Sequence, residues 1–88
     1  MKLIVAIVKG SDALPVSDAL VAAGYRVTRI ASTGGFLRRG NVTLLIGVEA
    51  EAVQEVSRLI EDHCETPDPG QHKATLFVLP AEDLVRLG

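Results

Sequence analysis

Four short apolar segments, separated by two segments with helical spacing, constrain the fold of this chain more than any other feature. Residues 3–8 form an uninterrupted apolar run rich in β-branched side chains, which is typical of a strand. Residues 25–32 alternate with a period of two, and residues 42–48 and 74–79 form two further apolar runs. We therefore predict four strands.

The two remaining periodic segments predict helices. In the first, Ser11 or Asp12 offers an N-cap and Gly24 ends the helix. The second begins at Glu49, which places acidic side chains near the positive end of the helix dipole. The apolar positions of the first helix are Ala13, Val16, Leu20 and Ala23, and those of the second are Ala52, Val53, Val56, Leu59, Ile60 and Cys64.

The resulting order is β-α-β-β-α-β, joined by loops at residues 33–41 and 65–73 and followed by a short helical turn and tail in residues 81–88. Right-handed crossovers fold this order as a ferredoxin-like α+β domain, in which both helices lie on one face of a four-stranded antiparallel sheet. A chain of 88 residues is one domain, residues 1–88.

The predicted strands are apolar on both faces. In the first strand, for example, Leu3, Val5 and Ile7 alternate with other apolar residues. The helices can cover only one face, and a large exposed apolar patch would aggregate. We therefore expect a homo-oligomer, and a closed trimer covers such a face better than a flat dimer does.

Composition excludes several classes of protein. Nine lysines and arginines against eleven aspartates and glutamates give a net charge of −2, without the basic excess that nucleic-acid polymers require. The single cysteine, Cys64, cannot form an internal disulfide, and the apolar run at residues 3–8 is too short for a signal peptide or a membrane span. We expect a cytoplasmic protein without a membrane partner.

Residues 32–43 carry the chemistry that is most informative about function. Gly34 and Gly35 allow a ligand to approach the backbone, and Arg38 and Arg39 add positive charge. Phe36 beside them suits a planar base that stacks near phosphates. An ordinary hairpin loop, with Phe36 packed against a neighbouring residue, fits the residue types equally well.

The same residues belong to a longer resemblance. The chain resembles the PII-like cyclic di-AMP receptors over Met1–Val8, Arg26–Thr28, Ser32–Thr43 and Ile46–Val48, and Ala74–Pro80 is similar to the last strand of that family. The resemblance implies a homotrimer of ferredoxin-like subunits with no catalytic activity and no cofactor. It also implies one cyclic di-AMP molecule in each cleft between subunits, and an unknown protein target.

The resemblance assigns ligand-binding roles to individual positions. It implies that three loop residues frame one adenine, that Asn41 anchors the loop or touches the ligand, and that the strand residues line the pocket. The three loop residues are Gly35, Phe36 and Leu37, and the strand residues are Arg26, Thr28 and Gly47. Without the resemblance, a surface charge at Arg26 and a bulge or packing notch at Gly47 would be the simpler interpretations.

The chain departs from the family pattern at two places. The connection at residues 65–73 is shorter than in many members, and Gly24 stands where many have asparagine. A shortened member could bind cyclic di-AMP weakly, bind another adenine nucleotide, or serve as a ligand-free adaptor trimer that contacts protein through residues 33–41.

Catalytic and metal sites have little support in the sequence. His63, Cys64 and His72 could approach one another, but Cys64 lies on an apolar helix stripe and neither histidine has a partner at ligand spacing. Glu51 and Glu55 share one helix side, yet exposed carboxylates do not form an acid-base pair. We predict no enzyme and no metal site.

Overall fold

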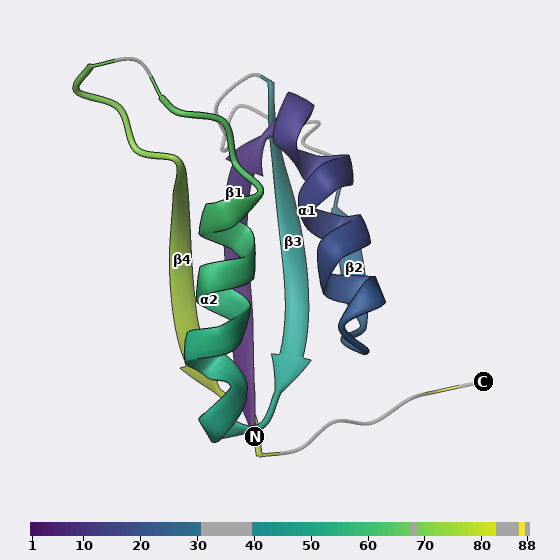
Figure 1. Cartoon of the computed structure of the whole chain (residues 1–88). Helices are drawn as coiled ribbons and strands as arrows, with labels where there is room; N and C mark the ends of the chain where they lie inside the picture. The colour runs from purple at the N-terminus through teal and green to yellow at the C-terminus, as the bar shows by residue number, and fades with distance from the viewer. Residues whose placement is uncertain (31–39, 68, 83–86, 88) are drawn as a thin grey trace.

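The computed structural model describes residues 1–30, 40–67, 69–82 and 87. Within these residues the chain forms four strands, two helices and one 3₁₀ turn (Figure 1). Their bounds are β1 Lys2–Lys9, α1 Gly10–Ala22, β2 Val27–Ile30, β3 Asn41–Val48, η1 Ala50–Ala52, α2 Val53–Asp62 and β4 Ala74–Pro80. The predicted order of strands and helices is confirmed.

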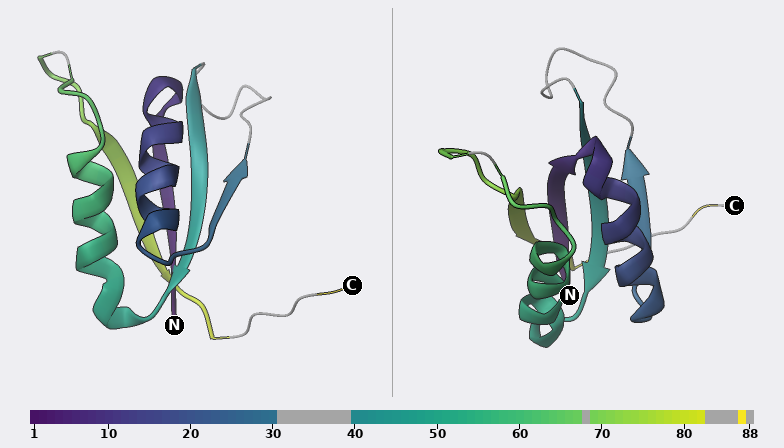
Figure 2. Two further views of the ribbon diagram at one scale, coloured as in Figure 1. Left: turned by 45° about the vertical axis from the view of Figure 1, so that its right-hand side comes forward. Right: turned by 45° about the horizontal axis from the view of Figure 1, so that its top comes forward.

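The strands form one antiparallel sheet in the order β2-β3-β1-β4. Each helix connects two strands that are separated by a third, because β3 lies between β1 and β2, and β1 lies between β3 and β4. Both helices cover the same face of the sheet (Figure 2). The predicted ferredoxin-like α+β fold is confirmed.

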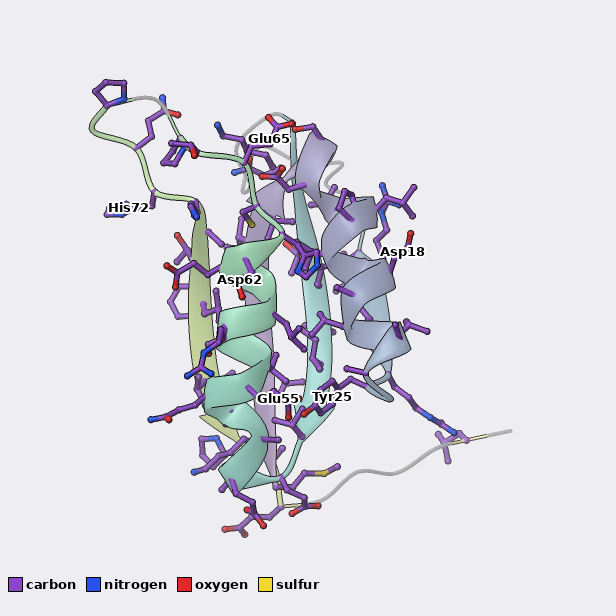
Figure 3. All side chains as sticks on the ribbon, in the orientation of Figure 1. Asp18, Tyr25, Glu55, Asp62, Glu65 and His72 are labelled. Carbon is purple, nitrogen blue, oxygen red and sulfur yellow. The ribbon has the colours of Figure 1, made fainter. Side chains whose placement is uncertain are left out.

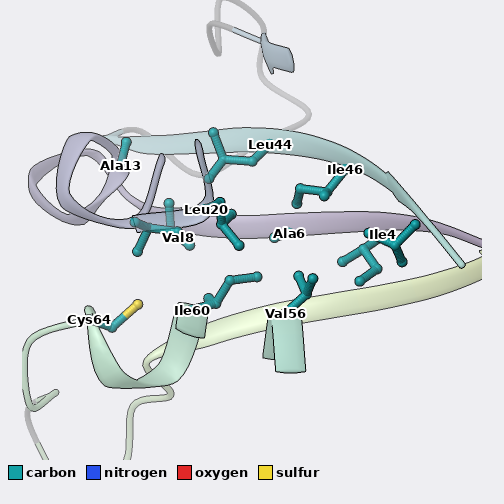
Figure 4. Close-up of a cluster of buried hydrophobic side chains, with 12 residues drawn as sticks. Ile4, Ala6, Val8, Ala13, Leu20, Leu44, Ile46, Val56, Ile60 and Cys64 are labelled. Carbon is teal, nitrogen blue, oxygen red and sulfur yellow. The ribbon is translucent and has the colours of Figure 1, made fainter. Parts of the chain in front are cut away.

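The hydrophobic core lies between the sheet and the two helices (Figure 4). Ile4, Ala6 and Val8 alternate along β1 and are fully buried, as are Leu44 and Ile46 opposite them on β3. The helices contribute Ala13, Val16, Leu20, Val56 and Ile60, with Cys64 next to the end of α2. The apolar residues that recur with the strand period and those that recur with the helix period therefore form one aliphatic core.

The predicted N-cap of the first helix is wrong. α1 begins at Gly10, and Lys9 is the cap residue without a side-chain cap hydrogen bond. The Gly10 backbone N–H already has an acceptor, because it donates to the carbonyl oxygen of Gly40 at 2.6 Å. Asp12 lies inside the first turn, where it is only 2% exposed and accepts a hydrogen bond from the backbone N–H of Glu65.

Other element boundaries differ from the predicted ones by a few residues. β2 begins at Val27 rather than at Tyr25, because the Tyr25 backbone N–H closes the end of α1 on the Leu20 carbonyl oxygen, at 3.0 Å. The turn η1 precedes α2, so that α2 begins at Val53 rather than at Glu49.

The chain ends also differ from prediction. β4 includes Pro80, which an edge strand tolerates because it has one unpaired side. Ala23, expected on the apolar stripe of the first helix, is exposed. The helical turn predicted for residues 81–88 falls largely outside the described residues, and Ala81, Glu82 and Leu87 belong to no regular element.

Among the described residues, no helix covers the other side of the sheet, which we call the open face. Strand alternation places on it the apolar side chains Leu3, Val5, Ile7, Leu45, Phe77 and Leu79. Phe77 is 52% exposed and Leu79 is 45% exposed. The expectation that both faces of the sheet are apolar is confirmed.

Candidate ligand-binding site

Two of the candidate residues lie close together on the open face. Thr28 on β2 pairs with Leu45 on β3, and Gly47 lies two residues further along β3. Val27 and Ile46, which pair with each other, belong to the opposite, helix-covered face. Thr28 and Gly47 are therefore diagonal neighbours, a relationship that typically separates residues by about 7–8 Å.

Gly47 leaves open space at this point of the sheet. The pairing of β3 with β1 continues without interruption through Leu3 and Gly47, which rules out a bulge. A Cβ atom added to Gly47 would lie 3.7 Å from Cε of Met1, an ordinary contact distance. The fold therefore does not require glycine here, and the space is accessible to a ligand from the open face.

Arg26 lies just before β2, next to a tyrosine that is hydrogen-bonded to α2. The Tyr25 hydroxyl donates to Oε2 of Glu55 on α2 at 2.7 Å (Figure 3). This hydrogen bond to a carboxylate, with lesser effects of desolvation and of the negative charge of Glu55, raises the pKa of Tyr25. Arg26 itself is exposed, so its guanidinium is accessible to an anionic ligand.

Asn41 lies at the other end of β3. It pairs with Lys9 and lies six positions before Gly47, a span of about 20 Å along a strand. The structure thus brings Thr28 and Gly47 together and leaves Asn41 where the chain enters β3 from the preceding loop. The adenine-framing residues expected from the resemblance, Gly35, Phe36 and Leu37, lie outside the described residues.

The connection at residues 65–73 is joined to both helices. Asp12 on α1 accepts the hydrogen bond from Glu65 at 3.2 Å, and the Lys73 ammonium donates to the Glu61 carbonyl oxygen on α2 at 3.3 Å. The side chain of Asp12 is buried, and no described group donates to its other oxygen, Oδ2.

Two hollows flank the end of this connection. One, of about 320 Å³, lies between α2 and β4 and is lined by Ser57, Ile60, Glu61, His72, Lys73, Ala74 and Leu76. The other, of about 220 Å³, is lined by Ile7, Val8, Lys9, Asn41, Gly70, Gln71, His72, Lys73, Ala74 and Thr75. The second hollow includes a candidate site residue, Asn41.

The histidines and the cysteine do not form a cluster. His63 is exposed and Nδ1 of its ring lies 2.8 Å from the Leu59 carbonyl oxygen, whereas Cys64 is buried. Burial, reinforced by the nearby charge of Asp12 and opposed by Lys73, raises the pKa of the Cys64 thiol. In the part of the chain that the structure describes, no three metal-ligating side chains are placed to hold an ion, and no helix has the length and apolarity to span a bilayer.

Sequence reasoning missed the residues whose importance depends on long-range contacts. Lys9 and Lys73 resemble ordinary solvated charges at strand ends, and Asp12 resembles an N-cap. Lys9 and Lys73 line the same hollow as Asn41 because β1 pairs with both β3 and β4, and Asp12 is buried where it accepts from Glu65.

Comparison with known proteins identifies a relationship that covers most of the chain. Residues 1–75 match the model of the cyclic-di-AMP receptor family. The crystal structure of a functionally unknown protein from Pediococcus pentosaceus ATCC 25745 is similar, with 38% sequence identity and a TM-score of 0.77. That match covers 98% of this chain and 96% of the other chain. Sequence motif, fold and family match agree, and the chain belongs to the cyclic-di-AMP receptor family.

Proposed function

We propose that this protein is a cytoplasmic signal transduction protein, without catalytic activity, that binds cyclic di-AMP in clefts between the subunits of a homotrimer. The observation that carries the proposal is the family match over residues 1–75. The sheet residues named by the resemblance support it, because Thr28 and Gly47 lie together on the open face and Arg26 is exposed beside them.

The open face supports an oligomeric state. Phe77 and Leu79 are about half exposed in a single chain, and soluble monomers rarely leave contiguous apolar patches of this kind uncovered. In a closed threefold arrangement, each subunit covers part of its neighbour's open face. Such an arrangement also sets residues of one subunit beside those of the next, which is where we propose the ligand binds.

Each candidate residue has a chemical role in this proposal. The Arg26 guanidinium binds a phosphate, the Thr28 hydroxyl forms a hydrogen bond, and Gly47 leaves room for the ligand. Phe36, between Gly35 and Leu37, stacks on an adenine, and Asn41 anchors the loop or touches the ligand. Binding then favours one conformation of the loop at residues 33–41, and the unknown protein target distinguishes the two conformations.

Calorimetric titration of the purified protein with cyclic di-AMP, AMP, ADP and ATP tests the proposal. We expect binding of cyclic di-AMP, with one ligand per subunit and with affinity higher than for the mononucleotides. A preference for a mononucleotide would mean that the proposed site binds that nucleotide rather than cyclic di-AMP. No binding of any adenine nucleotide would favour an adaptor trimer that contacts only protein.

Substitutions at the candidate site test its location. Phe36→Ala should weaken binding by roughly 5- to 150-fold, the loss expected when about 1 to 3 kcal/mol of stacking is removed. Arg26→Ala should weaken binding most at low salt, where charge pairing is least screened. Arg58→Ala is the matched control, because Arg58 is exposed on α2 on the other side of the sheet. Equal affinities in all three variants would place the ligand elsewhere.

A further inference from the structure

The hollow of about 220 Å³ is a feature that the candidate residues do not explain. It lies where β1, β3 and β4 meet the connection at residues 65–73, because Lys9 pairs with Asn41 and Val8 pairs with Ala74. Strand alternation puts Lys9 and Asn41 on the open face. Val8 and Ala74, which also line the hollow, belong to the helix-covered face, so the hollow lies at the end of the sheet and borders both faces.

The groups that line this hollow are those that bind anions. Lys9 and Lys73 supply positive charge, and the amides of Asn41 and Gln71 supply neutral donors. Lys9 and Lys73 are two of the three lysines in the chain, whose net charge is negative. Among the described residues that line the hollow there is no aspartate or glutamate, so no lining carboxylate neutralises them.

The ammonium groups of Lys9 and Lys73 can donate hydrogen bonds to a further partner. Lys73 donates one hydrogen bond, to the Glu61 carbonyl oxygen, and an ammonium group has three donors. Lys9 is partly buried at the end of β1. A phosphate placed between these groups would be screened less than one on an open surface.

We propose that this hollow binds a phosphate group, with Lys9 as its main cationic contact and with Lys73, Asn41 and Gln71 as additional donors. The hollow of about 220 Å³ is many times the space that one water molecule needs, so it has room for a phosphate. Resting on the proposed function, the inference is that one phosphodiester of the cyclic dinucleotide binds here. The rest of the ligand then lies outside the hollow, and the Arg26 and Thr28 that meet it belong to a neighbouring subunit, because the two ends of β3 in one chain are about 20 Å apart.

Titration of cyclic di-AMP into the wild type and three β1 variants tests this proposal. Lys9→Gln removes the charge, Lys9→Arg keeps it, and Lys2→Gln removes a charge at the opposite end of the same strand. We expect Lys9→Gln to weaken binding roughly 10- to 150-fold, which is the size of effect for a charge-assisted hydrogen bond. Lys9→Arg and Lys2→Gln should remain within about twofold of the wild type.

A second measurement separates this proposal from the proposed function. Inorganic pyrophosphate is titrated into the same four proteins, and the backbone amide signals of Lys9, Asn41 and Gln71 are followed by NMR. If the wild type binds no cyclic dinucleotide, the proposed function fails. In that case the anion site stands only if pyrophosphate shifts these signals in the wild type and in Lys2→Gln, but not in Lys9→Gln.

Two results would overturn the anion site. One is binding of cyclic di-AMP with the same affinity by Lys9→Gln and by Lys2→Gln. The other is the absence of pyrophosphate-induced shifts at these amides in a wild type that binds no dinucleotide. Thermal melting of each variant confirms that any loss of binding occurs in a folded protein.

Discussion

The carboxylate of Asp12 and the backbone N–H of Glu65 are hydrogen-bonded at 3.2 Å, although they are 53 positions apart in the chain. This contact joins the first turn of α1 to the beginning of the connection at residues 65–73. Gly10, two residues before Asp12, donates its backbone N–H to Gly40. The first turn of α1 therefore contacts both the residue that precedes β3 and the beginning of the connection at residues 65–73.

Two substitutions of Asp12 should separate the effect of its hydrogen-bond acceptor on stability from the effect of its negative charge. Asp12→Asn and Asp12→Ala both remove the buried charge, but only asparagine keeps an oxygen that can accept from Glu65. We expect the alanine variant to be less stable than the asparagine variant by about 1 kcal/mol, the usual net value of one hydrogen bond. Urea denaturation at equal protein concentration measures the difference. Equal stabilities would mean that this hydrogen bond does not stabilise the fold.

Gly10 should not tolerate a side chain. A Cβ atom at this position would lie 2.8 Å from the Gly40 carbonyl oxygen, which is backbone and cannot rotate away. We expect Gly10→Ala to destabilise the protein by about 1–3 kcal/mol, the usual cost of overpacking.

Gly47→Ala is the control, because its added Cβ would meet only the flexible end of Met1 at 3.7 Å. Chemical denaturation should leave the stability of this variant close to that of the wild type. Calorimetry should show weaker ligand binding, because the methyl group occupies the space proposed for the ligand. Normal stability of Gly10→Ala would contradict the contact with Gly40.

The Cys64 thiol should ionise at higher pH than a free cysteine. Burial of the thiol is the main cause, and Asp12 adds to it. Because the folded pKa is raised, the folded state holds this proton more tightly than the unfolded state, and the resulting stabilisation is lost as pH rises through the folded pKa. Alkylation with iodoacetamide, followed across pH by mass spectrometry, should have its midpoint above that of a cysteine in an unfolded peptide. A midpoint below the peptide value would refute this.

Tyr25 gives a second pH-dependent test that spectroscopy can follow directly. It is the only tyrosine, and the chain has no tryptophan. The wild type should titrate above the ordinary value of 10.0, because tyrosinate cannot donate to Glu55 and is repelled by its charge. Glu55→Ala should bring the ultraviolet titration midpoint back towards 10.0. The stabilisation from this contact is present below that pH and is lost as pH rises through the folded pKa. Identical midpoints in both proteins would exclude the interaction in solution.

A charged residue on the open face should disrupt assembly. Phe77→Glu puts a carboxylate on the surface that we propose is buried between subunits, where an unpaired charge is costly. Leu14→Glu is the matched control, since Leu14 is a similarly exposed apolar residue, but on α1. Light scattering should report a trimer for the wild type and for Leu14→Glu, and smaller species for Phe77→Glu. A monomeric wild type of 9.3 kDa would refute the trimer itself.

Local chemistry along the chain was sufficient to predict the fold. Periods of two and of about four residues identify the strands and helices, and the right-handed crossover leaves one arrangement for that order. The apolar character of both strand faces likewise depends only on alternation within each strand. The candidate loop motif could be found for the same reason, because its glycines, Phe36 and arginines are adjacent in sequence.

Tertiary structure decided the points that depend on residues far apart in the chain. The sequence offers Asp12 as a helix cap, but a backbone carbonyl of Gly40 takes the N–H of Gly10, and Asp12 is buried against Glu65 instead. Lys9, Asn41 and Lys73 come together only because β1 lies between β3 and β4 in the sheet. A hydrogen bond or a hollow between distant segments depends on which strands become neighbours, and the periodicity of any one segment does not contain that information.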